Sequence, residues 1–214
     1  PDNGGASNQT ITKALQWVLD HRAQYNIVAV NMSLGSGFYG SAAEAQSSIY
    51  VDRIRALKNA GVTVVAASGN SYKNHETQNS ASPGIVSTLD VGAVWQDGVN
   101  TGVTWGDGAQ DFTTGADRVT SFSQRLVAPN VVFAPGALIL STVPNNSYDY
   151  KGGTSMASPM VAGAVAPRIY ARRRPEATGG DRLGGHGTRV RGSRSMGSET
   201  TGSGSPADRV IDRR

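Results

Sequence analysis

Four short, nearly uninterrupted apolar runs constrain the fold of this 214-residue sequence more than any other feature. The runs span residues 27–34, 62–67, 89–94 and 131–136. Apolar residues at helical spacing over residues 11–25 and 41–60 precede the first two runs. A strand that is apolar throughout is typical of a parallel sheet covered on both faces, and alternation with helices supplies the crossovers that such a sheet needs. The pattern therefore predicts an α/β fold: a mainly parallel sheet flanked by helices on both faces.

Turn and cap residues delimit these segments. Thr10 is expected to cap the first helix, and Gly61 to end the second. Residues 95–124, between the third and fourth runs, are rich in Gly, Thr and Asp and form a connection longer than an ordinary loop. Aromatic residues spaced among its glycines indicate an ordered, hairpin-like insertion, to which we assign no chemistry.

Charge divides the chain into two parts. Residues 167–214 contain eleven arginines against five acidic residues, a balance of +6, whereas residues 1–166 have a balance of −2. Apolar residues nearly vanish in the basic part, so it cannot bury enough surface to offset the entropy lost on ordering. We therefore expect a folded domain over residues 1–166 and a disordered Arg/Gly-rich tail over 167–214. That tail is either a genuine extension or the product of a reading-frame change in a GC-rich gene.

Composition excludes several classes of function. The chain has no cysteine, so disulfides, thiolate chemistry and Cys-based metal sites are absent. It has no apolar run of about 18 residues that would span a membrane, and no signal peptide is visible in it. The basic tail could bind polyanions in a salt-sensitive manner. It lacks interleaved aromatic residues, however, so we do not expect a nucleic-acid partner, and the oligomeric state stays open.

Residues 150–163 contain the densest chemical pattern in the chain. Two glycines allow a tight turn just before Ser155, and the small and apolar residues after it predict a buried helix, with Pro159 in its first turn. A serine hydroxyl becomes an effective nucleophile when a base takes its proton and the resulting oxyanion is stabilised. Free N–H groups at a helix N-terminus favour that developing negative charge. Ser155 is therefore the candidate nucleophile.

The run Gly-Thr-Ser-Met-Ala-Ser-Pro at residues 153–159, followed by Val-Ala-Gly, resembles the nucleophile signature of the subtilases, the subtilisin-like serine peptidases. The resemblance covers roughly residues 10–166, the C-terminal portion of the catalytic domain. It implies a three-layer subtilisin-like fold and an enzyme that hydrolyses polypeptides. Ser155 would attack the peptide carbonyl and form an acyl-enzyme.

Two upstream strand ends are similar to the same family, in the expected order. The strand that ends at Asn70 resembles the one whose terminal Asn donates a hydrogen bond to the oxyanion, which implies that role for Asn70. The strand over residues 30–35 resembles the one that pairs with the substrate backbone. It implies substrate contacts for Ser33, Leu34 and Gly35. Both strand ends fall at the carboxyl edge of the predicted sheet, where α/β proteins bind ligands.

The family's catalytic Asp and His have no counterpart where they are expected, before residue 10. His21 in a predicted helix and His75 in a polar loop are expected at the surface. His186 lies in Gly-His-Gly-Thr, similar to the family's histidine motif, but it follows the serine and no apolar helix accompanies it. We expect it to be a tail residue. Pro167 and the arginines after it are expected to end the nucleophile helix early.

Two hypotheses stay open. The chain is either a fragment of an active serine endopeptidase whose Asp and His motifs lie upstream, or a non-catalytic pseudopeptidase or peptide-binding module. The intact Ser155 and Asn70 favour the fragment, which we expect to have little or no activity alone. Resemblance implies secretion and would allow a structural calcium ion, but no ligand cluster assigns a metal site and no cofactor is expected. The sequence does not set the preference for the residue before the scissile bond.

Overall fold

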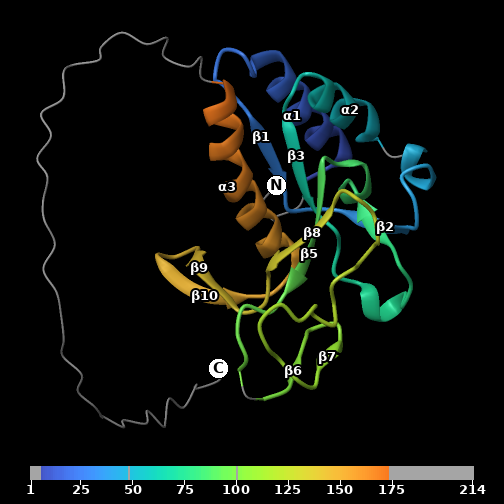
Figure 1. The fold of residues 1–214 in the computed structure, drawn as a ribbon, viewed down its shortest axis with the longest axis vertical. Helices are drawn as coiled ribbons and strands as arrows, with labels where there is room; N and C mark the ends of the chain where they lie inside the picture. The colour runs from blue at the N-terminus through green and yellow to red at the C-terminus, as the bar shows by residue number, and fades with distance from the viewer. Residues whose placement is uncertain (1–5, 48, 100, 174–214) are drawn as a thin grey trace, which may run out of the picture. The chain divides into compact units, whose positions relative to one another are not determined.

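Four parallel strands form the centre of the structure, a computed structural model that describes residues 6–47, 49–99 and 101–173 (Figure 1). In spatial order they are β1 (Ala29–Met32), β3 (Thr63–Ala67), β5 (Leu89–Val94) and β8 (Val131–Pro135). All neighbouring pairs are parallel, with Val30 beside Val64 and Val91 beside Val132. The four apolar runs are therefore confirmed as strands of one parallel sheet.

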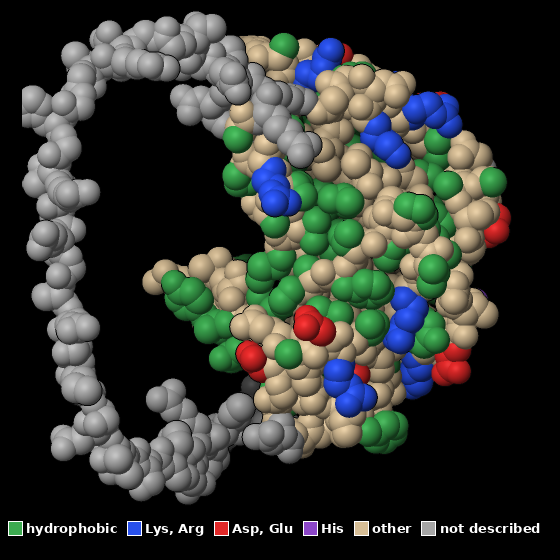
Figure 2. All heavy atoms as spheres, in the orientation of Figure 1, with side chains coloured by type: hydrophobic (Ala, Val, Ile, Leu, Met, Phe, Trp, Pro, Cys, Tyr) green, Lys and Arg blue, Asp and Glu red, His purple; other side chains and the backbone are tan. Residues whose placement is uncertain are grey.

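Helices cover both faces of the sheet, as predicted. The side chains of β3 alternate between the faces, because successive residues of a strand point to opposite sides. Val64 and Ala66 pack in a cluster with Leu15 of α1 (Asn8–His21) and Leu57 of α2 (Val51–Asn59). Val65 packs on the other face in a cluster that includes Ala157 of α3 (Thr154–Arg173). In the space-filling view, hydrophobic side chains gather in the middle of the face shown (Figure 2).

The helices on the first face differ from the prediction at their ends. Helix α1 begins two residues before Thr10, and its N-cap is Ser7, whose Oγ accepts a hydrogen bond from the Thr10 N–H at 3.2 Å. The helix expected over residues 41–60 is split into a 3₁₀ turn, η1 (Glu44–Ser47), and α2.

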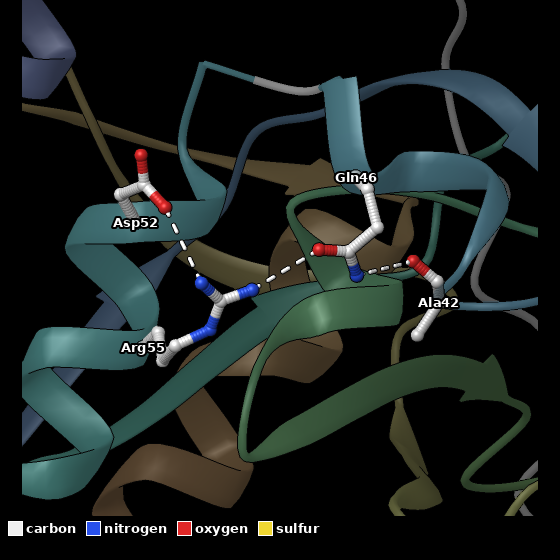
Figure 3. Close-up of polar contacts among 4 residues, drawn as sticks. All are labelled: Ala42, Gln46, Asp52 and Arg55. Atoms are coloured by element: carbon white, nitrogen blue, oxygen red, sulfur yellow. Dashed lines mark hydrogen bonds and ion pairs between the residues drawn. The ribbon is translucent and has the colours of Figure 1, made fainter.

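Arg55 joins the two pieces of this split helix (Figure 3). Its guanidinium donates to Gln46 of η1 at 3.0 Å and to Asp52 of α2 at 3.4 Å. Gln46 in turn donates to the backbone carbonyl of Ala42 at 2.9 Å. The Arg55–Asp52 pair is largely exposed, so it fixes the geometry of the turn more than it adds to stability.

Three two-stranded antiparallel sheets lie outside the central sheet. They pair β2 (Ser36–Tyr39) with β4 (Ser80–Ser82), β6 (Val103–Thr104) with β7 (Gln110–Asp111), and β9 (Ile139–Val143) with β10 (Ser147–Lys151). The β6–β7 hairpin lies within residues 95–124, where a hairpin was expected, and Trp95 at the start of this segment is only 1% exposed. The other two pairings were not predicted. Two further 3₁₀ turns are η2 (Tyr72–Asn74) and η3 (Gly84–Val86).

Helix α3 continues through Pro167 to Arg173, so the prediction that it ends before Pro167 is wrong. Residues 167–173, which were predicted to belong to the tail, are therefore part of this helix. Pro167 has no N–H to pair with the carbonyl of Gly163, four residues earlier. Gly163 is exposed and lacks a side chain that would crowd the proline ring, so water can hydrate this carbonyl. The rest of the predicted tail, including His186, lies outside the described residues. Within them, no helix is both long and apolar enough to cross a membrane.

Candidate active site

The carboxyl end of β1 meets the N-terminus of α3, and this brings Ser33 and Ser155 together across 122 residues of sequence. The Ser155 hydroxyl donates to the backbone carbonyl of Ser33 at 3.3 Å. In the opposite direction, the Ser33 hydroxyl donates to the backbone carbonyl of Ser155 at 2.8 Å. The structure thus joins a predicted substrate-binding residue to the predicted nucleophile.

Pro159 explains why the Ser155 carbonyl is available to Ser33. Helix α3 begins at Thr154, so Pro159 lies in its second turn. The prediction that Pro159 lies in the first turn is wrong. In a regular helix the N–H of residue 159 would pair with the Ser155 carbonyl, but proline has no N–H. The Ser33 hydroxyl donates to the Ser155 carbonyl in place of the missing N–H. Asn31 supports it by donating to Ser33 Oγ at 2.9 Å while accepting from Ser158 Oγ at 2.5 Å.

Asn70 follows β3 and lies against the same helix start. Its Oδ1 accepts two hydrogen bonds from Thr154, one from the backbone N–H and one from the hydroxyl, both at 2.8 Å. Only the amide oxygen can accept these two hydrogen bonds, so the atom that faces Thr154 is Oδ1 and Nδ2 points away from Thr154. A Cβ placed on Gly153 would lie 3.3 Å from Nδ2. Among the described residues Nδ2 has no hydrogen-bond partner, so a donor next to Ser155 is free.

Gly69 allows this arrangement. Its φ of +105° lies in the region that residues with a side chain rarely adopt. The conformation turns the chain from β3 so that the Gly69 N–H donates to Thr154 Oγ1 at 3.1 Å while Asn70 accepts from the same threonine. The positions of Asn70 and Ser155 are therefore coupled through one side chain, Thr154.

A cavity of about 270 Å³ lies beside Ser155. Its wall includes two of the three predicted substrate-binding residues, Leu34 and Gly35, whereas Ser33 contributes the contacts to α3 described above. The remaining lining residues are Ser36, Gly37, Phe38, Ala67, Gly69, Asn70, Ser71, Ala81, Gln124 and Thr154. Phe38, Ala81 and Gln124 were not predicted, because their segments show no periodicity or motif that points to a site.

A second, more apolar cavity of about 480 Å³ also reaches Ser155. It lies between the β9–β10 hairpin and the start of α3, and Ile139, Val143, Met156 and Met160 are among its lining residues. Ser155 is therefore flanked by concave surfaces on two sides. An extended chain that crossed Ser155 could place side chains in both.

The described residues supply no base to Ser155: no His, Asp or Glu among them hydrogen-bonds to its hydroxyl. His75 is exposed and packs against Phe38, with ring centroids 3.6 Å apart. His21 is half-buried and therefore less exposed than predicted. Its ring stacks on that of Trp17, with the ring centroids 4.4 Å apart. The same part of the chain holds no group of three or more His, Cys, Asp or Glu residues that could bind a metal ion.

Asp90 is a buried acid that the sequence did not single out. It lies on β5 with no exposed surface, and neither carboxyl oxygen has a hydrogen-bond partner among the described residues. Burial raises the pKa of Asp90 to about 7, an effect that the nearby Ser80 hydroxyl only partly opposes. That hydroxyl instead makes long hydrogen bonds to backbone carbonyls, at 3.4 Å to Ser68 and 3.3 Å to Ala81.

Comparison with known proteins decides the family. The sequence profile of the subtilase family matches residues 1–179 of this chain. The chain belongs to the subtilase family. The resemblance seen in the motifs around Ser155 is thereby confirmed, and so is the subtilisin-like α/β fold.

Individual subtilases match most of this chain but only part of their own length. Subtilisin DY from Bacillus licheniformis is 34% identical over 164 residues, which is 77% of this chain and 49% of the relative. An extracellular serine proteinase from Thermus sp. (strain Rt41A) is 32% identical over 178 residues, 82% of this chain and 35% of the relative. The chain therefore spans about half or less of the length of these relatives.

Solved structures give the same picture. The S41 psychrophilic protease superposes with a TM-score of 0.59 at 27% identity, covering 80% of this chain and 52% of that one. A cold-adapted subtilisin-like serine proteinase gives 0.55 at 25% identity, covering 78% and 50%. The matched part of this chain thus corresponds to about half of each of these two solved chains.

Proposed function

We propose that this chain is the nucleophile-bearing part of a serine endopeptidase. The observation that carries the proposal is the amide of Asn70, which lines the same cavity as Ser155: Thr154 holds its oxygen, and its nitrogen has no partner among the described residues. A preorganised neutral donor of this kind stabilises negative charge without adding a competing charge.

In the proposed reaction, Ser155 Oγ attacks the carbonyl carbon of a peptide bond and transfers its proton to a base. The carbonyl oxygen becomes an oxyanion that accepts a hydrogen bond from Asn70 Nδ2. Collapse of this intermediate breaks the C–N bond as the base returns the proton to the nitrogen, which releases the amine and leaves an acyl group on Ser155. Water then hydrolyses the acyl group. The chemistry needs no cofactor.

Substrate binding would use the end of β1 and the cavity next to it. An extended peptide gains main-chain hydrogen bonds when it lies along a strand end, and cavities select its side chains. We place the side chain that precedes the scissile bond in the 270 Å³ cavity walled by Leu34 and Gly35. In line with the extracellular relative from Thermus, we propose that the parent enzyme acts on polypeptides outside the cell.

One observation favours a second candidate, a non-catalytic peptide-binding module. Within the described residues, Ser155 donates to the Ser33 carbonyl and no base takes its proton. The endopeptidase therefore requires a histidine from outside these residues, either upstream or at His186. The peptide-binding module requires none.

A serine-directed fluorophosphonate probe separates the two. We expect weak or no labelling of the 214-residue chain, and strong labelling of a longer product of the same gene that contains the Asp and His motifs. Ser155→Ala should abolish the labelling, whereas Ser147→Ala, on the exposed strand β10, should not. If the gene encodes neither motif upstream, or if the longer product stays unlabelled, the peptide-binding module is the better account.

A further inference from the structure

Gln124 places a nearly buried amide in the wall of the cavity beside Ser155. Its side chain is 2% exposed. Backbone hydrogen bonds hold the residue against the end of β3: its N–H donates to the Gly69 carbonyl at 2.9 Å, and its carbonyl accepts from Ser68 Oγ at 2.8 Å. The position of this amide is therefore set by the strand that carries Asn70.

The nitrogen end of the amide is fully engaged on the side away from Gly69. Gln124 Nε2 donates to the Gly37 carbonyl at 3.2 Å and to Asn79 Oδ1 at 2.8 Å. A backbone carbonyl can only accept, so this end must be the nitrogen. Asn79 is fixed in the same manner, because its own nitrogen donates to the carbonyls of His75 at 3.1 Å and Thr77 at 2.9 Å. The chain of amides leaves one orientation for Gln124.

The oxygen end of Gln124 therefore faces Gly69. A Cβ built on Gly69 would lie 1.9 Å from Oε1, so the oxygen occupies the space that a side chain at residue 69 would need. In the described part of the chain Oε1 accepts no hydrogen bond. The fully buried side-chain atoms there without a partner belong to Arg53, Asp90 and Trp95, so the unpartnered Gln124 oxygen keeps some exposed surface, and Gln124 lines the cavity. Its oxygen is a fixed acceptor with no donor among the described residues.

The rest of this cavity offers no charge. Leu34, Phe38, Ala67 and Ala81 supply apolar surface, and its described lining contains no Lys, Arg, His, Asp or Glu. A ligand carboxylate would meet the oxygen of Gln124 without a counter-charge, which is costly in a partly buried site. A neutral group with an O–H or N–H at its tip would satisfy that oxygen and keep its stem against these apolar side chains.

We propose that Gln124 is a specificity-determining residue that selects, before the scissile bond, a side chain ending in a neutral hydrogen-bond donor, such as Tyr or Gln. This inference rests on the proposed function, because it assigns the cavity to that substrate side chain. It predicts discrimination between side chains of the same shape. Tyr is preferred over Phe, Gln over Met, and Glu is disfavoured.

Peptide boronic acids test this in the 214-residue chain, because a serine hydroxyl adds to boron without a leaving group. Isothermal titration would compare N-acetyl tetrapeptide boronates that differ only in the last side chain. We expect the Tyr compound to bind about 3- to 10-fold more tightly than the Phe compound, the contribution of one neutral hydrogen bond. Gln124→Met, which keeps the length but removes the acceptor, should bring the ratio to about 1. The matched control Gln110→Met, at the exposed position of strand β7, should leave it unchanged.

A variant that gains a new preference cannot be explained by misfolding, so a second substitution of Gln124 serves as a further test. Gln124→Glu should favour a boronate ending in Lys over one ending in Met by about 10-fold or more, since it adds a negative charge to the cavity. Equal binding of Tyr and Phe compounds by the unmodified chain, with Ser155 still required, would overturn the role of Gln124 and leave the proposed function standing. Binding of neither compound by this chain or by the longer product that contains the Asp and His motifs, or binding that Ser155→Ala does not weaken, would contradict the proposed function and the inference with it.

Discussion

Asn70 illustrates how one side chain is aimed by another. Its oxygen is occupied twice by Thr154, so the nitrogen is the end that can reach an oxyanion. Either alternative, an unpaired oxygen or a rotated amide, would leave Thr154 N–H without its acceptor. The orientation that the proposed reaction needs and the one that satisfies the helix start are therefore the same.

Replacing this amide should slow the chemistry without disturbing the nucleophile. We expect Asn70→Ala to reduce turnover by about 100- to 1000-fold in the form of the protein that contains the catalytic base, the usual effect of removing an oxyanion donor. Peptide hydrolysis rates would measure it, with Asn74→Ala in the exposed turn η2 as the matched control. Comparable losses in both variants would argue against a role for Asn70 in the reaction.

Asp90 links stability to pH. The folded state holds this acid in its protonated form up to a pKa of about 7, against an ordinary value of 3.8. Folding therefore takes up a proton between about pH 4 and pH 7. The contribution of Asp90 to the free energy of unfolding falls as pH rises through this window and is constant above it. The difference between these two pKa values corresponds to on the order of 4 kcal/mol.

Asp90→Asn should remove this dependence, since an amide does not ionise. We expect the variant to unfold at a higher temperature than the unmodified chain at pH 8, and the difference to disappear near pH 4. Thermal unfolding followed by circular dichroism over pH 4–8 measures both. Asp97→Asn, at an exposed position, is the control and should change neither. A difference that stays constant with pH would show that Asp90 is not the titrating group.

At the scale of elements, the sequence predicted what local patterns determine. A strand buried on both faces must be apolar throughout, so β1, β3, β5 and β8 were visible as runs. The pairing of β2 with β4 joins segments some 40 residues apart, and neither has a local pattern that specifies its partner. The sequence did not predict a role for Gln124 for the same reason. Its role depends on Gly37 and Asn79, which only the folded chain brings to it.

Helix α3 is the element in which local preference and structure disagree most. Pro167 removes one helical hydrogen bond, yet the helix continues for six residues beyond it. Packing supplies a reason: Val161, Ala162 and Val165 contact the core cluster on this face of the sheet. Tertiary contacts just before the proline thus hold the helix axis in place.

Pro167→Ala should therefore stabilise the chain by restoring the bond to the Gly163 carbonyl. We expect an increase of about 1–3 kcal/mol in the free energy of unfolding, at or below the cost of a proline inside a helix. Urea unfolding followed by far-ultraviolet circular dichroism would measure it. Arg168→Ala, at the exposed neighbouring position, should have little effect. If both variants match the unmodified chain, the helix ends before Pro167 in solution.

At the scale of the folded part as a whole, the sheet separates two apolar clusters. One contains Leu57 and Val64 beneath α1 and α2, and the other contains Val91 and Ala157 beneath α3. The clusters share no side chain, but they share β3, whose residues alternate between them. Disrupting either cluster removes packing from the same strand, so the two faces should lose structure together.

Leu57→Ala tests this coupling, because the reporters can be placed on the opposite face. Trp17 lies on α1, whereas Trp95 and Trp105 contact each other at 5.7 Å, and Trp105 packs on the second cluster. In a Trp17→Phe background, the fluorescence therefore reports the face away from Leu57. Leu57→Ala should lower the free energy of unfolding by about 2–5 kcal/mol. It should move the urea midpoints of fluorescence and circular dichroism equally, while Asn59→Ala on the exposed side of α2 moves neither. A fluorescence midpoint that stays in place while the circular dichroism midpoint falls would mean that the two faces unfold independently.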